Sequence, residues 1–509
     1  MAFDFTRRHF FFGSLLAGAV PSAGFGSTPS LKALGYKSPN EKLNIASIGA
    51  GGKAASDIAG CAPTENIVAL CDVDEVRAKA VFNRYEKLPK YKDFRKMLDK
   101  EGDGIDAVII AIPDHMHATA AMHCMSRGKH VYTQKPLCRT IWEARQLQEA
   151  ANRFKVATQM GNQGYSNEGT RQCAEMIWSG AIGDVKEVHA WTDRPWWPQG
   201  VTEIPPADAV PSTLDWDMWL GMAAPRDFTS GGAAYEHNQY GHFYQPFNWR
   251  GFFDFGCGAL GDMACHILGA PNLSLRLGTP TSVEAIKKEG TSPFQFPKAS
   301  VIKFDFPARG NMPPVTLYWH DGLKDQPKIQ GVPENEYLGD LPRIGNAGRG
   351  GRGGRGANGQ PLPPPEPTGF IGDVFKFNEA YLPSEERRHV SPDGSLFIGD
   401  KGLITTGTYG EDTRLLPVEK MRDYRFPPPL LTRSPGHYRD WIRACKGGDP
   451  ACSNFNVAAP FVEWMLLGVI ALRAEGKIEY DPAKMRITNN AEANQYLKPF
   501  IRKGWNFAG

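Results

Sequence analysis

Two titratable side chains lie four residues apart in the segment GCGALGDMACHILG. The apolar spacing over 258–270 predicts a helix, on which Asp262 and His266 would share one face. An imidazole beside a carboxylate can move a proton while the carboxylate orients the ring. The same spacing occurs on ordinary helix surfaces, so it indicates acid–base chemistry only where further groups converge on it. A zinc site is not expected, because no further ligands have a suitable spacing.

A glycine-rich turn in IASIGAGGKAA is the second candidate. Its small residues are Gly49, Gly51, Gly52 and Ala54. They follow a predicted strand and open a predicted helix, in the pattern G-x-G-x-x-G/A that seats a pyrophosphate at a helix N-terminus. Asp72 ends the next predicted strand, where a carboxylate accepts hydrogen bonds from a ribose 2′-hydroxyl and repels a 2′-phosphate. We therefore expect NAD in preference to NADP, which the nearby cations Lys53 and Arg77 keep as the alternative.

The predicted elements place both candidates in a two-domain chain. Alternating strands and helices predict a mainly parallel, doubly wound sheet. The strands are expected at 43–48, 67–71, 107–112, 130–133 and 156–160, and the helices at 74–86, 115–127 and 140–154. Later strand-like stretches, at 185–191, 282–286, 300–305 and 315–319, predict an α+β domain with an open, mainly antiparallel sheet. We expect helical segments at 437–446 and 458–476 to end the fold and to pack between the domains.

The expected boundaries follow from these patterns. Residues 1–40 form a signal and linker, 41–160 a dinucleotide-binding domain, and 161–509 a substrate and oligomerisation domain. The Gly/Arg/Pro-rich run at 345–367 cannot bury a core and is expected to be a flexible insertion. An open sheet face favours a homodimer or tetramer. The net charge of +3, without a basic stripe, argues against a nucleic-acid partner.

The segment AIPDHMHATAAMHCMSRGKHVYTQKPL carries a resemblance to a known family. Its strand ending in Ile-Pro113, the helix with Asp114 and His117 in its first turn, and the Lys135-Pro pair after the next strand resemble the Gfo/Idh/MocA oxidoreductases. The resemblance extends from residue 43 to the C-terminus, with one departure: the family signature reads Glu-Lys-Pro, and Gln134 stands here in place of the glutamate.

The resemblance implies an NAD(P)-dependent oxidoreductase that acts on CH–OH groups of carbohydrates. It implies that Lys135 and His266 exchange protons with the hydroxyl being oxidised and that Asp262 lies beside them. Besides the glycine turn and Asp72, the cofactor contacts expected are Pro113, His117, Gln134, Lys135, Asn162, Trp249 and Arg250.

Aromatic and charged side chains early in the second domain suggest a sugar subsite. The loop TDRPWWPQG holds Arg194, Trp196 and Trp197, and His237 follows in a polar-aromatic cluster. Aromatic faces stack on the apolar faces of sugar rings while polar neighbours bind the hydroxyls. Packing of either tryptophan in the core is an equal alternative for this loop.

The N-terminus, MAFDFTRRHFFFGSLLAGAV, resembles a twin-arginine signal. Its apolar run is too short to span a membrane, so we expect export of the folded protein to the periplasm by the twin-arginine machinery. Nine cysteines, an odd number without metal-site spacing, predict buried free thiols.

Export places the protein away from a nicotinamide pool, so the cofactor is expected to remain tightly bound and to be restored in each cycle. Two chemistries meet this requirement: hydride transfer to a second carbonyl, or transient oxidation during a redox-neutral cleavage or epimerisation. A non-catalytic exported sugar-binding protein is the third alternative.

Overall fold

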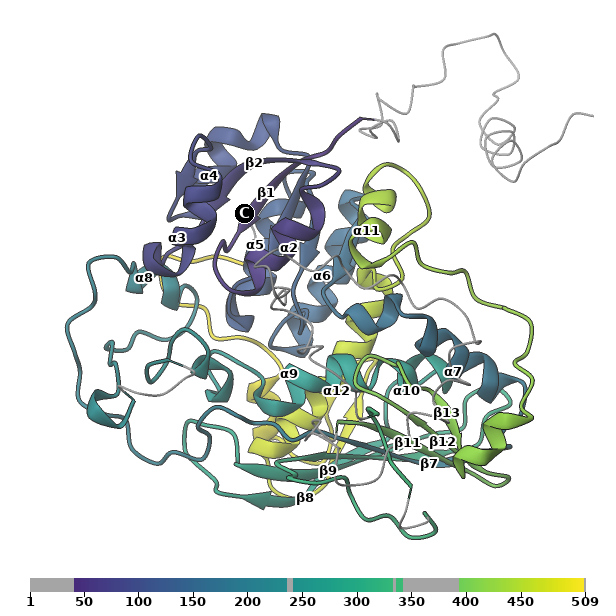
Figure 1. The fold of residues 1–509 in the computed structure, drawn as a ribbon. Coiled ribbons are helices and arrows are strands. Elements are labelled where there is room, and N and C mark those ends of the chain that lie inside the picture. Colours follow the sequence, from purple (N-terminus) through teal and green to yellow (C-terminus); the bar gives the residue numbers. More distant parts are fainter. Residues whose placement is uncertain (1–40, 236–240, 333–335, 342–392, 508–509) are drawn as a thin grey trace, which may run out of the picture.

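The computed structural model describes residues 41–235, 241–332, 336–341 and 393–507, which form two sheets with helices around and between them (Figure 1). The predicted signal and linker at 1–40, His237 and the insertion at 345–367 lie outside the described residues.

The first sheet has six parallel strands in the order β3-β2-β1-β4-β5-β6. They are β1 (Asn44–Ile48), β2 (Asn66–Cys71), β3 (Lys90–Tyr91), β4 (Ala107–Ile110), β5 (His130–Thr133) and β6 (Thr158–Met160). The central β4, with the sequence AVII, is buried along its whole length, as expected for a strand covered on both faces. The chain order reverses between β1 and β4, and doubly wound sheets bind ligands at such a reversal. The predicted doubly wound sheet is confirmed.

Five helices belong to this sheet: α2 (Lys53–Cys61), α3 (Glu75–Arg84), α4 (Phe94–Glu101), α5 (Asp114–Met125) and α6 (Ile141–Phe154). The start of α6 is fixed by a capping box, in which Thr140 accepts from the Glu143 backbone and the Glu143 carboxylate accepts from the Thr140 backbone. α5 is buried on every side, because it lies between the first sheet and the rest of the molecule.

The second sheet has nine strands in the order β13-β12-β11-β7-β10-β9-β8-β14-β15. They are β7 (Val185–Trp191), β8 (Ser282–Glu289), β9 (Ala299–Phe306), β10 (Val315–Asp321), β11 (Gly394–Gly399), β12 (Leu403–Thr406), β13 (Arg414–Leu416), β14 (Ile478–Asp481) and β15 (Arg486–Ile487). β7 and β10 pair in parallel, and the other neighbouring pairs are antiparallel. The predicted mainly antiparallel sheet is confirmed.

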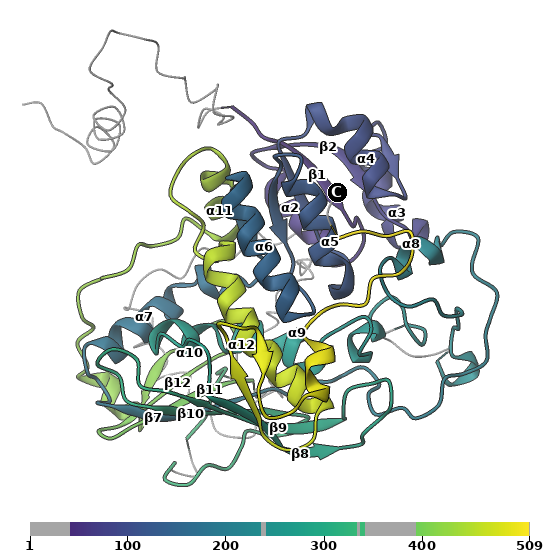
Figure 2. The same ribbon diagram turned by 180° about the vertical axis from the view of Figure 1, so that it is seen from behind.

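A layer of helices separates the two sheets (Figures 1 and 2). It contains α7 (Glu168–Trp178), α9 (Gly258–Ile267), α10 (Gly269–Ser274) and α12 (Phe455–Arg473). α12 contacts α6 on one side and the strands β8 and β9 on the other. By length and composition α12 could cross a membrane, but most of it is buried here as a core helix, with Trp464 packed edge-on against Phe304 and Phe306.

The chain crosses between the domains more than once. The short α8 (Trp216–Leu220) lies beside the first domain, and α11 (His437–Cys445) packs against α2, where Trp441 joins the core of the first sheet. The expectation that the segment at 458–476 ends the fold was wrong. β14, β15 and the tail follow it, and in the tail Trp505 stacks under Arg95, 4.3 Å from ring centroid to guanidinium carbon.

Candidate active site

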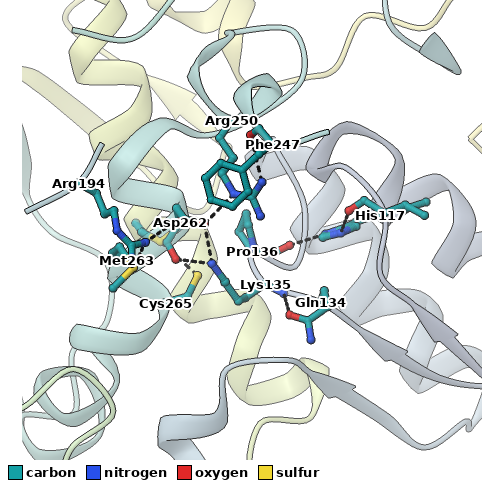
Figure 3. A network of polar contacts seen from close by, with 12 residues as sticks. His117, Gln134, Lys135, Pro136, Arg194, Phe247, Arg250, Asp262, Met263 and Cys265 are labelled. Atoms are coloured by element: carbon teal, nitrogen blue, oxygen red, sulfur yellow. Dashed lines mark hydrogen bonds and ion pairs between the residues drawn. The ribbon is translucent and has the colours of Figure 1, made fainter. Parts of the chain in front are cut away.

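Lys135 lies at the carboxyl end of β5, where the sequence predicts it (Figure 3). The preceding residue, Gln134, continues the strand ladder, because its backbone N–H donates to the Ile110 carbonyl at 2.8 Å. The Lys135 ammonium reaches across to α9 of the second domain. Its Nζ donates to the backbone carbonyl of Asp262 at 2.5 Å and to Oδ1 of the same residue at 2.8 Å. The two residues predicted from separate motifs therefore meet.

Asp262 is surrounded by cations (Figure 3). Besides Lys135, the Arg250 Nε donates to Oδ1 at 3.0 Å, and an Arg194 terminal nitrogen donates to Oδ2 at 3.1 Å. Burial alone would raise the pKa of the Asp262 carboxyl, but Lys135, Arg250 and Arg194 hold it well below its ordinary value. Asp262 is therefore a permanent anion that fixes three cationic side chains at one point.

His266 lies one helical turn after Asp262 on α9, as the spacing predicts. Burial, reinforced by the charge of Lys135, lowers the pKa of its imidazole well below the ordinary value. The ring is therefore neutral near pH 7, the form that can accept a proton. Its Nδ1 is buried and has no hydrogen-bond partner among the described residues.

Tyr409 lies against His266, with ring centroids 4.7 Å apart in an edge contact, and 36% of the residue is exposed. It belongs to the loop between β12 and β13. The loop backbone is fixed there, because the Tyr409 carbonyl accepts from Asn167 at 3.0 Å and its N–H donates to Glu411 at 2.7 Å. The sequence analysis missed this residue. The local sequence GTYGEDT indicates only a turn, and nothing in it points to α9.

A further carboxyl group faces this cluster from the first domain. Asp114 opens α5, and burial raises its pKa to about 7, although Arg250 and Lys135 act to lower it. The site therefore combines an ionised carboxylate, Asp262, with a carboxyl that is close to half protonated at neutral pH.

The glycine turn has the geometry that a dinucleotide requires. Gly49 has φ 92°, and a Cβ there would lie 2.4 Å from the Ala111 carbonyl oxygen, so only glycine fits. Gly52, the residue directly before α2, has φ 58°, and no side chain caps the helix. The first N–H groups of α2 therefore remain available to an anion such as a pyrophosphate.

Asp72 makes hydrogen bonds within the protein in addition to the ribose contact predicted for it. Its Oδ2 accepts from the backbone N–H groups of Ala50 at 2.8 Å and Gly51 at 3.1 Å, so the carboxylate holds the glycine turn in place. The Arg77 side chain packs directly against Gly51 and Gly52. The ribose contact of Asp72 stays a prediction.

Asn162 is well suited to bind a ligand at the strand ends. The residue is completely buried, and neither atom of its side-chain amide has a hydrogen-bond partner among the described residues. Buried amides are almost always satisfied, so this position, next to the end of β6, fits a bound cofactor or substrate.

The remaining residues predicted to contact the cofactor are Pro113, Trp249, Arg250 and His117. Pro113 directly precedes α5, and the Arg250 guanidinium stacks on Trp249 at 4.4 Å. His117 has a different place from the one expected. Its two ring nitrogens lie 2.7 Å from the carbonyl oxygens of Pro136 and Ile112, and burial lowers its pKa to about 4. A neutral imidazole has one N–H, so it donates to only one of these carbonyls, and both ring nitrogens are directed at the backbone of the protein.

The two adjacent tryptophans of the loop TDRPWWPQG lie in different places, Trp196 at the candidate site and Trp197 in the core. Arg194 stacks on Trp196, with 3.5 Å between guanidinium carbon and ring centroid, so this pair lines the Asp262 cluster. Trp197 is 2% exposed and donates its indole N–H to Gln199. The expectation of a sugar contact at Trp197 was wrong, because the residue belongs to the core.

All nine cysteines are free, and eight are buried, as predicted. Within the described ranges no group of three or more His, Cys, Asp or Glu side chains could hold a metal ion.

Two family models match consecutive parts of the chain. Residues 43–162 match the NAD-binding Rossmann fold of the GFO_IDH_MocA oxidoreductase family, and residues 178–286 match the C-terminal alpha/beta domain of the same family. The parallel sheet and the open helix start at the glycine turn agree with the NAD-binding Rossmann fold of the first model. Together the two matched ranges cover less than half of the chain, and both are similar to domains of the Gfo/Idh/MocA oxidoreductases.

Curated relatives match part of the chain. Over 125 residues it is 30% identical to inositol 2-dehydrogenase of Salmonella typhimurium, which covers 24% of this chain and 37% of that protein. Over 184 residues it is 28% identical to a glycosyl hydrolase family 109 protein of Solibacter usitatus, which covers 33% of this chain and 41% of the relative. The chain thus spans less than half the length of these relatives.

A solved structure extends the likeness over most of the fold. The WlbA dehydrogenase of Bordetella pertussis, in complex with NADH and UDP-GlcNAcA, covers 87% of this chain and 99% of its own, with a TM-score of 0.52 and 14% identity. This likeness shows the same fold.

Proposed function

We propose that the protein is an NAD-dependent dehydrogenase that transfers hydride between a hydroxyl-bearing carbon of a sugar or polyol and a tightly bound nicotinamide. The observation that carries the proposal is the meeting of Lys135 with the Asp262–His266 pair, which come from different domains. The inositol 2-dehydrogenase relative supports a polyol or sugar as the substrate class.

The chain's own residues supply the acid–base chemistry. Bound NAD supplies the hydride acceptor at the carboxyl edge of the first sheet. His266, held neutral by burial and by Lys135, takes the proton of the substrate hydroxyl. The Lys135 ammonium, anchored by Asp262, donates a hydrogen bond to the same substrate oxygen and stabilises the negative charge that develops on it. Asp262 accepts hydrogen bonds from the Lys135 ammonium and so keeps the lysine in place.

The residues around this cluster fit a carbohydrate. Tyr409 and the Arg194–Trp196 pair present aromatic and cationic surfaces beside Asp262 and His266. Aromatic faces and hydrogen-bond donors together suit a ring that has one apolar face and several hydroxyls.

A redox-neutral cycle is the second candidate. In it, oxidation of one hydroxyl acidifies the neighbouring C–H, a group is eliminated or an epimer forms, and the hydride returns to the sugar. The relative named as a glycosyl hydrolase family 109 protein favours this alternative. Both cycles leave the cofactor in place, which agrees with the proposed export by the twin-arginine route to the periplasm. As a separate part of the proposal, the protein works as a homo-oligomer.

The test uses the full-length protein purified from the periplasm. After gel filtration and denaturation, we expect about one nicotinamide nucleotide for each chain, identified as NAD by an enzymatic assay. Mixing the holoprotein with a panel of monosaccharides, polyols and glycosides should produce the absorbance band of reduced nicotinamide with at least one of them. Reduction that persists until a second carbonyl compound is added indicates net transfer, whereas transient reduction with release of an aglycone indicates the redox-neutral cycle.

The third alternative, a non-catalytic sugar-binding protein, predicts a different outcome. Sugar would bind with no reduction of the nicotinamide by any substrate, and Lys135→Ala would leave the binding isotherm unchanged. Loss of the nicotinamide on simple gel filtration would overturn the proposal of a tightly bound cofactor.

A further inference from the structure

Asp57 is a second buried carboxylate that lies outside the Asp262 cluster. It belongs to the second turn of α2, below the glycine turn, and the residue is 0% exposed. Three groups donate to it. The Lys53 ammonium pairs with Oδ1, the Tyr438 hydroxyl donates to the same oxygen at 2.7 Å, and the Gln134 amide donates to Oδ2 at 2.8 Å. A buried charge needs such partners, so each of these donors matters.

Gln134 is the residue that departs from the Glu-Lys-Pro signature, and the structure gives its reason. The Nε2 atom donates to Asp57, while Oε1 accepts from the Lys135 backbone N–H at 3.3 Å. An amide can donate on one side and accept on the other, whereas an ionised glutamate can only accept. A glutamate at this position would face the Asp57 carboxylate across a hydrogen-bond distance, and two like charges in a buried site cannot both stay ionised.

Gln134 has close neighbours on both sides. A Cβ on Gly161, the residue directly after β6, would lie 2.7 Å from Oε1. The Tyr132 hydroxyl lies 3.4 Å from Nε2 on the other side. The amide is therefore held between β6 and α2, with its orientation fixed by Asp57.

α11 completes this arrangement from the far end of the chain. Tyr438, its second residue, supplies the hydroxyl that binds Asp57, and its ring would be 2.4 Å from a Cβ on Gly60 of α2. Lys53 is the first residue of α2 and also lies 3.3 Å from the Tyr438 hydroxyl. The carboxylate is thus shared by the helix that follows the glycine turn, the strand that carries the lysine, and α11.

We propose that Asp57 supplies the carboxylate that the family signature carries directly before the lysine, and that the Asp57–Gln134 pair positions Lys135 for reaction. Asp57 acts through Gln134 and is a positioning residue. The proposal of a positioning role rests on the proposed function, in which Lys135 contacts the substrate oxygen. The pairing of Asp57 with Gln134 does not depend on that function and can be tested by stability alone.

The experiment exchanges the two groups. The variants are Gln134→Glu, Asp57→Asn and the double exchange Asp57→Asn/Gln134→Glu, each made in the full chain with its cofactor. The double exchange keeps one carboxylate and one amide in contact, with their places reversed. The matched control is Asp57→Asn/Gln159→Glu, because Gln159 is an equally buried glutamine on β6 that donates to the His437 carbonyl at 2.8 Å.

Three quantities are measured for each variant: the midpoint of thermal unfolding, the nicotinamide content, and kcat and KM with the sugar found in the panel. We expect each single variant to lower the unfolding midpoint by several degrees, as a mismatched buried polar group does. We expect kcat to fall about tenfold or more in the single variants, because a misplaced reacting group slows the chemical step. In the double exchange the midpoint and kcat should return to within a few degrees and about threefold of the wild-type values.

Each outcome decides one part of the proposal. If the double exchange is no more stable than the single variants, or if the Gln159 control recovers as well, the pairing is wrong. If stability returns while kcat stays low and KM and nicotinamide content are normal, the pair is structural and its positioning role is wrong. If no sugar reduces the nicotinamide of the wild-type protein, the proposed function fails, while the unfolding midpoints still report on the pair.

Discussion

The molecule holds two buried carboxylates in different ways. Asp262, between the domains, is bound by three cations, Lys135, Arg194 and Arg250. Asp57, below the glycine turn, is bound by one cation and by two neutral donors, a tyrosine hydroxyl and a glutamine amide. Charged partners keep a carboxylate ionised and also gather cations where a substrate oxygen can be bound. Neutral donors fix directions without adding charge. The arrangement around Asp262 therefore suits a group beside the reacting atoms. The arrangement around Asp57 suits a group that positions the reacting residues without touching the substrate.

The largest effect is expected at the charged cluster. Asp262→Asn removes the anion and leaves Lys135, Arg194 and Arg250 close together without it. We expect kcat to fall by about a hundredfold or more, and the free energy of unfolding to fall by about 3 kcal/mol, the cost of breaking a buried ion pair on one side. Denaturant titration and steady-state kinetics measure both.

The matched control for this change is Asp254→Asn. Asp254 is 43% exposed at its side chain and pairs with Arg226, so its loss should change stability by less than about 1 kcal/mol. Equal losses in the two variants would contradict the view that the surroundings of Asp262 are special.

Lys135 is expected to give the next largest effect. Lys135→Met keeps much of the side-chain volume but removes the donor to the substrate oxygen, so kcat should fall by about a hundredfold while nicotinamide content is unchanged. Lys135→Arg tests geometry at constant charge. Because the bonds to Asp262 are short and specific, we expect arginine to restore less than about a tenth of the activity. Full activity of either variant would remove Lys135 from the mechanism.

The pH dependence of activity reports on the protonation of His266 beside Lys135. The pKa of His266 is lowered by burial and then by Lys135, so the ring stays neutral below pH 6.5, where a free histidine takes up a proton. We therefore expect wild-type kcat/KM to show no limb from His266 between pH 8 and 6.5, so that any limb near pH 7 reports Asp114, whose pKa burial raises to about 7. Lys135→Met removes the positive neighbour and raises the pKa of His266, so the acid limb of its residual activity should move to higher pH. A limb that stays in place or moves lower would show that Lys135 does not act on His266.

The smallest effect is expected at the neutral donors. Tyr438→Phe deletes one hydrogen bond to Asp57 and keeps the ring, so the free energy of unfolding should fall by about 1–2 kcal/mol. KM should be unchanged, since Tyr438 lies behind the cofactor helix. The control is Tyr235→Phe, a half-buried tyrosine packed on Phe243 in another cluster. If Tyr438→Phe lowers kcat or changes KM while the free energy of unfolding is little changed, α11 lies closer to the reacting groups than we describe.

The residues that sequence reasoning found lie in strong local patterns. Lys135 follows a strand, Asp262 and His266 are one helical turn apart, and the glycine turn combines a strand, a tight turn and a helix. The structure brings the first three together. Such features can be predicted because they depend on neighbours within a few residues.

The features that were missed depend on distant contacts or on short elements. Asp57 and Gln134 are 77 positions apart, and Tyr409 meets His266 only because the loop between β12 and β13 lies against α9. β3 has two residues and α4 eight, too few for a clear period. The role of His117 depends on two backbone carbonyls, which no side-chain pattern reveals. Trp197 looked like part of a sugar platform because the sequence does not show which of two adjacent tryptophans points inward.

The position of α11 has a consequence for how the protein is made. Trp441, Ile442 and Cys445 complete the hydrophobic cluster under β1 and α2, and Tyr438 closes the pocket around Asp57. The ribosome makes these residues about 400 positions after Lys53. Domains usually fold as units with the N-terminal one first, but here the nucleotide-binding half lacks part of its interior until nearly the whole polypeptide has been synthesised. We expect cofactor loading to be a late event that follows release from the ribosome, and a fragment ending at residue 160 to be unable to retain nicotinamide.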